Sequence, residues 1–172
     1  KQLKCDVMAA DGDASELLLM YLEKYEDCIV VCGLKSKGKL INKLFGDTIT
    51  NLLKHIHFPM LVVPEGVGDV KMDKLLFATD FHLDTDIRTL LPVLSFAKLG
   101  ATKITVLRIM NTDATAIEEL NYRSERITDF FSAYHPEFVF LKSDNVSDAI
   151  NHYTQSNQID LLTMITKPHS FM

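Results

Sequence analysis

The sequence is poor in the residues that mark several special classes of protein. Its 172 residues include no tryptophan, five prolines, seven glycines and three cysteines. So little glycine and proline excludes a collagen-like or low-complexity chain, and three cysteines are too few for a scaffold built on disulfides. No apolar run approaches the ~20 residues that a membrane-spanning helix needs. What remains is a globular composition, with 47% hydrophobic and 24% charged side chains.

The charge and the cysteine content of the sequence restrict the cellular compartments and the classes of binding partner that we expect for the protein. Eighteen Lys and Arg against 23 Asp and Glu leave a net charge of −5 at pH 7 with histidine neutral, which disfavours a nucleic-acid binder that works by bulk positive charge. No apolar stretch of the signal-peptide kind follows Lys1. We interpret Cys28 and Cys32 as reduced core thiols rather than metal ligands. We therefore expect a cytoplasmic protein that binds neither nucleic acid nor membrane.

Short apolar runs alternate with amphipathic segments along the chain. The runs at 28–32 and 60–63 are apolar on both faces, as in strands buried in a parallel sheet, and we expect Gly33 and Pro64 to end them. Expected strands lie at 3–9, 28–32, 60–63, 74–79, 103–109, 137–141 and 160–166, and expected helices at 17–25, 40–56, 84–99, 112–134 and 146–156. Strands joined by helices pair in parallel. The pattern predicts an α/β fold with a doubly wound parallel sheet and helices on both faces.

Residues 65–72 divide this pattern into two parts. They contain two glycines and little apolar side-chain mass, and we interpret them as a linker. The predicted organisation is a first domain part at 1–64, the linker, and a second domain part at 73–172.

The two ends of the chain resemble each other. Residues 13–21 match residues 145–153 at an offset of 132, which aligns Ser15 with Ser147 and Tyr21 with Tyr153. At an offset of 133, Asp27 aligns with Asp160. Either Asp13 or Ser15 is expected to cap the first helix. A period near 132 means that the chain holds one repeat and roughly 40 residues of another. We expect a fragment of a tandem protein, truncated at both ends; the alternative is a coincidence of α/β regularity.

One segment has the spacing of a phosphate-binding loop. Residues Gly33–Lys39 spell GxxxxGK between an expected strand and an expected helix, but Leu40 follows. A P-loop needs Ser or Thr there to hold magnesium. A P-loop-like NTPase that uses Gly33–Lys39 is one hypothesis, and a solvated basic turn is the other.

An ordered set of motifs resembles the universal stress protein family. The second half of that family's domain runs strand, Gly-x2-Gly-x9-Gly-[Ser/Thr], helix and a closing strand. Asp27–Gly33 is similar to its strand and first glycine, nine residues separate Ser36 from Gly46, and 58–64 is similar to the closing strand. The family's domain start looks like 74–81. The resemblance covers nearly the whole chain, and it implies a Rossmann-like fold.

The resemblance also implies a nucleotide site. In nucleotide-binding members a glycine-rich loop and the following helix start hold the phosphates through backbone N–H groups, and the Asp after the first strand lies near the sugar. The positions that correspond here are Gly33, Ser36, Gly46, Asp47, Asp80 and Val106. The implied cofactor is ATP or AMP with Mg²⁺, and no cofactor is an equal expectation. Gly33 and Gly46 belong to the first part and Asp80 to the second, so each half-site lacks its partner.

Two departures weaken the implied site. Ser36 replaces the second glycine and brings a Cβ where a phosphate passes, and Asp47 replaces Ser/Thr. A carboxylate ~4 Å from a phosphate charge costs about 4 kcal/mol at an effective dielectric constant near 20. We expect a stress-response or regulatory module, not a committed enzyme, with weak or no nucleotide binding. The alternative is an ATP- or AMP-binding stress protein with slow ATP hydrolysis.

A partner is expected at the end of the first part. The apolar segment 60–64 should lie at a sheet edge, where unpaired backbone groups invite another strand. We expect a homodimer, or a pseudo-dimer of tandem domains, through this strand.

Overall fold

The computed structural model of the chain describes residues 4–34, 47–68, 71–80, 87–100, 103–110 and 125–165. The chain divides into two compact units. Unit 1 comprises Lys1–Lys35, Phe45–Glu65 and Pro168–Met172, and unit 2 comprises Ser36–Leu44 and Gly66–Lys167. The division at Glu65 lies at the start of the expected linker. The assignment of each part to a universal-stress-protein domain stays a prediction.

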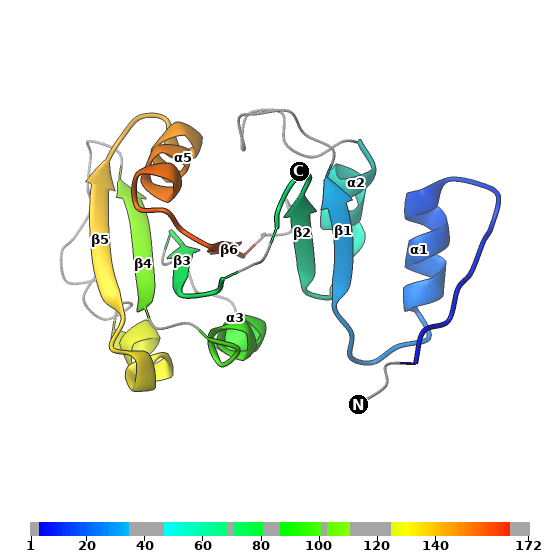
Figure 1. Cartoon of the computed structure of the whole chain (residues 1–172), viewed down its shortest axis with the longest axis horizontal. Coiled ribbons are helices and arrows are strands. Elements are labelled where there is room, and N and C mark those ends of the chain that lie inside the picture. Colours follow the sequence, from blue (N-terminus) through cyan, green and yellow to red (C-terminus); the bar gives the residue numbers. More distant parts are fainter. Residues whose placement is uncertain are drawn as a thin grey trace, which may run out of the picture. The chain divides into compact units, whose positions relative to one another are not determined.

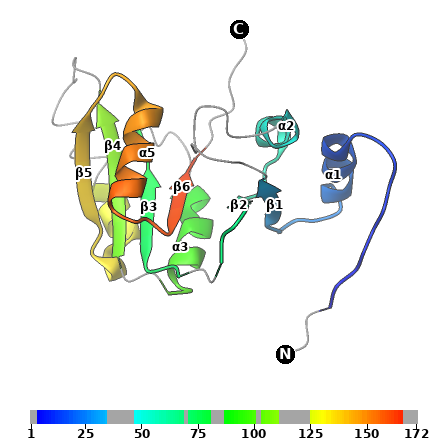
Figure 2. The ribbon, with the colours of Figure 1, turned by 45° about the horizontal axis from the view of Figure 1, so that its top comes forward.

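Unit 2 contains a parallel sheet of four strands (Figures 1 and 2). The strands are β3 (Lys74–Ala78), β4 (Lys103–Met110), β5 (Glu137–Lys142) and β6 (Leu161–Met164). Their order in the sheet is β5-β4-β3-β6, and every neighbouring pair is parallel. The helical elements are η1 (Ile87–Leu90), α3 (Leu91–Ala97), η2 (Ser132–Tyr134) and α5 (Val146–Ser156), and residues 125–130 are also helical.

Helices cover both faces of this sheet. On one face Leu75 and Phe77 of β3 pack with α3 and the helix around Ile127. On the other face Leu76 of β3 packs with Ile150 of α5. Consecutive residues of a strand point to opposite faces, so β3 contributes to both clusters. The predicted α/β class with a parallel, doubly wound, Rossmann-like sheet is confirmed.

Unit 1 is smaller and holds a parallel strand pair (Figure 1). The helix α1 (Ala14–Leu22) precedes β1 (Val30–Leu34), and α2 (Asp47–His55) lies between β1 and β2 (Met60–Pro64). Among the described residues of the unit, the buried ones are Ser15, Leu22, Val30, Leu34, Ile49 and Leu52.

Three strand predictions in unit 1 are wrong. Residues 4–10 form no strand, although 3–9 were expected to form one. A strand needs a hydrogen-bonded neighbour, and in the described part of unit 1 the only paired strands are β1 and β2. Gly33 does not end β1 but lies inside it, paired with Val63. Val31 is 63% exposed, so β1 is not buried on both faces.

The two aligned helix starts fit the expected internal repeat, which stays a prediction, whereas residues 4–10 form no strand and their counterpart Glu137–Lys142 is β5. Asp13 caps α1 by accepting hydrogen bonds from the backbone N–H groups of Ser15 (2.9 Å) and Glu16 (3.1 Å). Asn145 caps α5 by accepting one from the N–H of Asp148 at 3.1 Å. The two caps lie at the offset of 132, and of the two residues expected to cap the first helix, Asp13 and Ser15, Asp13 is the cap.

The two caps predict different responses to acid. Hydrogen bonds from Glu16 and Ser15 lower the pKa of Asp13 below its ordinary value of 3.8. A lowered folded-state pKa stabilises the helix above the unfolded pKa, and this stability is lost as the pH falls through the folded pKa. On acidification α1 is expected to lose the amide-exchange protection given by its cap, whereas the capping oxygen of α5 belongs to the neutral amide of Asn145, which itself donates to Asp148 Oδ2 at 2.7 Å. Asp13→Asn should retain the cap and abolish the difference; persistence of the difference in this variant would contradict the assignment.

The carboxyl end of α5 forms a Schellman turn. The N–H of Ile159 donates to the carbonyl oxygen of Thr154 at 3.0 Å, and the N–H of Gln158 donates to that of Gln155 at 3.2 Å. Gln158 has a φ of 53°, in the left-handed region. This position normally favours glycine, so the chain carries strain here.

Gln158→Gly is therefore expected to stabilise unit 2. The left-handed conformation costs a non-glycine residue about 1–2 kcal/mol, and the greater freedom of glycine in the unfolded chain offsets part of the gain. We expect the free energy of unfolding to rise by about 0.5–1 kcal/mol, measured by urea denaturation. The matched control is Gln155→Gly inside α5, which should lower it by about 1 kcal/mol. A loss of stability in Gln158→Gly would rule out this account.

Candidate functional site

The carboxyl edge of the unit 2 sheet is the candidate site. The chain passes from β3 through α3 to β4 on one side, whereas α5 leads back across the sheet to β6 on the other side of β3. The strand order thus reverses between β3 and β6. In open α/β sheets ligands bind at such a reversal, outside the carboxyl ends of the strands.

Asp80 lies directly at this reversal. β3 ends at Ala78, which is paired with Met164 near the end of β6. Beyond it, the N–H of Thr79 donates to the carbonyl oxygen of Leu107 at 3.0 Å, which continues the hydrogen bonding with β4. The exposed Asp80 follows immediately. A carboxylate at the carboxyl end of a central strand is placed to accept hydrogen bonds from a ligand hydroxyl group.

Val106 occupies a different environment. It lies in β4, between Phe77 of β3 and Phe138 of β5, and its side chain is fully buried in the apolar cluster beneath α3. This side chain contributes to the core of unit 2 rather than to its surface.

The remaining predicted positions belong to unit 1 or lie outside the described residues. Gly33 is in β1, and a Cβ added to it would meet no heavy atom of the described residues within 4 Å. Asp47 is the first residue of α2, but its side chain is outside the described set. Ser36 and Gly46 lie outside the described residues, as do Lys35–Lys39. The described positions are thus divided, with Gly33 and Asp47 in unit 1 and Asp80 and Val106 in unit 2.

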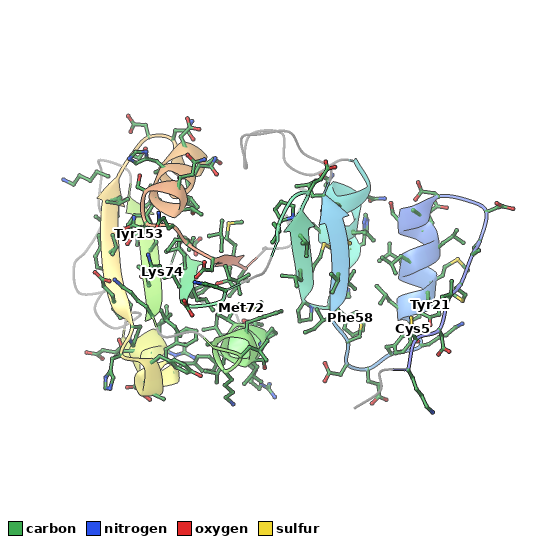
Figure 3. The ribbon with its side chains drawn as sticks, in the orientation of Figure 1. Cys5, Tyr21, Phe58, Met72, Lys74 and Tyr153 are labelled. Atoms are coloured by element: carbon green, nitrogen blue, oxygen red, sulfur yellow. The ribbon has the colours of Figure 1, made fainter. Side chains whose placement is uncertain are left out.

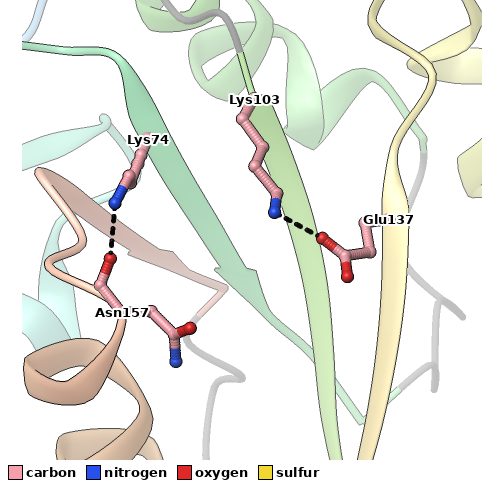
Figure 4. A network of polar contacts seen from close by, with 4 residues as sticks. All are labelled: Lys74, Lys103, Glu137 and Asn157. Atoms are coloured by element: carbon pink, nitrogen blue, oxygen red, sulfur yellow. Dashed lines mark hydrogen bonds and ion pairs between the residues drawn. The ribbon is translucent and has the colours of Figure 1, made fainter.

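The opposite, amino edge of the unit 2 sheet is held together by polar contacts that sequence reasoning missed (Figure 4). Lys103 Nζ lies 2.7 Å from Glu137 Oε2, and Lys74 Nζ donates to the carbonyl oxygen of Asn157 at 2.9 Å. The backbone N–H of Lys74 donates to Asp160 Oδ2 at 2.9 Å, and the Asp160 N–H donates back to the Lys74 carbonyl oxygen at 3.0 Å. These groups join strand starts to one another, so this edge has a structural role.

Lys103, Cys32 and His55 are described titratable residues outside the carboxyl edge, and each is accounted for by its local surroundings. The hydrogen bond to Glu137 raises the pKa of Lys103, which keeps this ion pair charged until strongly alkaline pH. Burial raises the pKa of the Cys32 thiol, which disfavours the reactive thiolate. His55 contacts the Asn51 carbonyl oxygen of its own helix at 2.9 Å. In the described part of the chain, no three His, Cys, Asp or Glu side chains gather as a metal site.

No protein-family model matches the chain, and no curated protein matches it. No helix in the described ranges is both long and apolar enough to cross a bilayer.

Proposed function

We propose that the chain is a cytoplasmic regulatory module of the universal stress protein type, with its ligand-binding edge at the carboxyl end of β3. The observation that carries the proposal is the strand order β5-β4-β3-β6 with Asp80 directly beyond β3 at the reversal. β3 and Asp80 lie within residues 74–81, the segment that resembles the start of a domain in this family. The module acts through binding rather than through committed catalysis.

Adenine-nucleotide binding at this edge is weak in our proposal. The described positions that resemble phosphate-binding residues, Gly33 and Asp47, belong to unit 1 and are not part of the edge beyond β3. Asp47 also carries a carboxylate where a hydroxyl group suits a phosphate. Asp80 supplies the favourable contact, because an ionised acceptor makes a stronger hydrogen bond to a sugar hydroxyl group than a neutral one does.

Asp80→Asn is expected to weaken the binding of Mg-ATP about tenfold. Loss of one hydrogen bond to a charged group costs about 1.5–3 kcal/mol, and the Asn amide retains a neutral acceptor, so the lower end applies. NMR titration of the full chain with Mg-ATP measures the affinity through amide shifts. In the parent chain we expect the shifts to centre on Thr79, Asp80 and Ile165.

The matched control is Asp129→Asn, which removes the same charge from an exposed position on the helix at 125–130. This variant should leave the affinity unchanged, and thermal melting of both variants checks that the fold is retained. If Mg-ATP at millimolar concentration shifts no resonance near Asp80, or if the two variants lose affinity equally, the proposed nucleotide site is wrong.

Native mass spectrometry of the purified chain separates the other hypotheses. Our proposal predicts a chain free of nucleotide and paired with a second copy, because β2 has a strand neighbour on one side only among the described residues. Stoichiometric ATP or AMP would instead favour a nucleotide-binding stress protein with slow hydrolysis.

A P-loop-like NTPase is the less favoured alternative. Gly33 lies within the ladder between β1 and β2, one residue before the end of the strand, rather than at the start of a loop. Magnesium-dependent turnover that is lost in Lys39→Ala would nevertheless support this activity.

A further inference from the structure

Two tyrosine side chains in unit 1 form a contact that no part of the proposed function uses. The hydroxyl group of Tyr25 donates a hydrogen bond to the hydroxyl oxygen of Tyr21 at 2.7 Å. The ring centroids are 5.4 Å apart and the ring planes are inclined by 54°. Tyr21 lies in the last turn of α1 (Figure 3), and Tyr25 lies in the turn just beyond it, where its N–H donates to the Leu22 carbonyl oxygen at 3.0 Å.

The surroundings leave this pair open to solvent. Tyr25 is 43% exposed and Tyr21 is half-buried. The Lys24 ammonium lies 5.3 Å from the centroid of the Tyr21 ring. The hydrogen bond to Tyr21 raises the pKa of Tyr25, which agrees with a hydroxyl group held as donor. A small oxidant can therefore reach a pair whose hydroxyl groups already point at each other.

We propose that Tyr21 and Tyr25 form an oxidative modification site, at which a one-electron oxidant joins the two rings as dityrosine within one chain. In dityrosine the rings are joined at the carbons next to the hydroxyl groups, so these groups lie side by side and hydrogen-bond. The folded chain already holds them in that arrangement. Coupling then requires only rotation of the two side chains to bring the neighbouring ring carbons together.

The chemistry balances with hydrogen peroxide as the final electron acceptor, used by a peroxidase. One electron is taken from each phenol, and each hydroxyl proton passes to water. The two phenoxyl radicals form one carbon–carbon bond. The hydrogens on the bonded ring carbons then leave as protons while the oxygens regain theirs. The protein loses two hydrogens in total, and one hydrogen peroxide is reduced to two waters.

The effect of the bond follows from where it lies. It would tie the last turn of α1 to the turn that leads towards β1, two segments that otherwise separate when the helix end frays. Because the contact is held by the fold, coupling should be faster in the folded chain than in the unfolded chain, where the two residues are equally close in sequence.

The test exposes the full chain, at low concentration, to a peroxidase and limiting hydrogen peroxide. Peptide mass spectrometry should find Tyr21 joined to Tyr25 in monomeric protein with a loss of two hydrogens, and dityrosine fluorescence should appear with it. Tyr21→Phe and Tyr25→Phe should each abolish both signals. The matched controls Tyr134→Phe and Tyr153→Phe remove half-buried tyrosines of unit 2 and should leave both signals unchanged.

Three results would overturn the proposal. Equal yield in concentrated urea would show that the folded geometry contributes nothing. Cross-links mainly between chains, or involving Tyr134 or Tyr153, would show general exposure rather than a site. Oxidation of Cys28 in place of ring coupling would identify the thiol as the site instead. In the expected case, the cross-linked protein also shows slower amide exchange at the end of α1.

Discussion

Phe77→Ala is expected to lower the free energy of unfolding of unit 2 by about 3–5 kcal/mol, the usual cost of deleting a fully buried phenylalanine ring. Phe77 lies in β3, at the centre of the sheet, between Val106 of β4 and Thr163 of β6. Its side chain is fully buried, and its ring centroid lies 6.3 Å from that of Phe131. The truncation removes both apolar burial and this aromatic contact, so a cavity remains between the sheet and the helices at its face.

Urea denaturation followed by circular dichroism measures this loss, and hydrogen exchange assigns it to unit 2. The control is Leu99→Ala, which shortens a side chain of the same unit that is 71% exposed. It should change the free energy of unfolding by no more than about 0.5 kcal/mol. A cost below about 1 kcal/mol for Phe77→Ala would mean that this ring is not part of a packed core.

Leu52→Ala is expected to destabilise unit 1 by about 2–5 kcal/mol. Leu52 belongs to α2 and is 2% exposed. In its described ranges the unit has a two-stranded sheet and a short set of buried side chains, so one lost isobutyl group is a large part of this apolar burial. A loss of this size approaches the total stability of a small folded unit, and we expect α2 to lose its protection from hydrogen exchange.

The matched control for this experiment is Met20→Ala on α1. Met20 is 65% exposed, so its truncation should leave exchange in α2 and the urea midpoint nearly unchanged. Equal effects of the two substitutions would indicate that α2 does not pack through Leu52.

Two of the predicted nucleotide-binding residues show what the sequence could predict about this site and what it could not. Asp80 was predicted through the family resemblance, as the Asp after the first strand of a domain, and in the fold this residue follows the end of β3. Gly33 was recognisable as a glycine after an apolar run, but the strand continues through it to Leu34. β1 extends through Gly33 to Leu34 because these residues pair with β2, a strand that lies far away in the sequence.

Several features of the chain were determined by the sequence itself. The alternation of apolar runs with amphipathic stripes predicted the order of strands and helices in unit 2, because the periods of strand and helix are properties of the local backbone. The cap at Asp13 follows from the same local chemistry, as does its counterpart Asn145 at the same place in the repeat.

Only the tertiary structure decided which segments find partners. Residues 4–10 have a strand-like composition yet pair with nothing in the described part of unit 1, so they form no strand. Asp160 joins the backbone of Lys74 across 86 residues. Such a contact depends on which distant segments of the chain the fold brings together. Local propensity carries no information about that placement, and it is therefore the fold that creates the edge at Asp80.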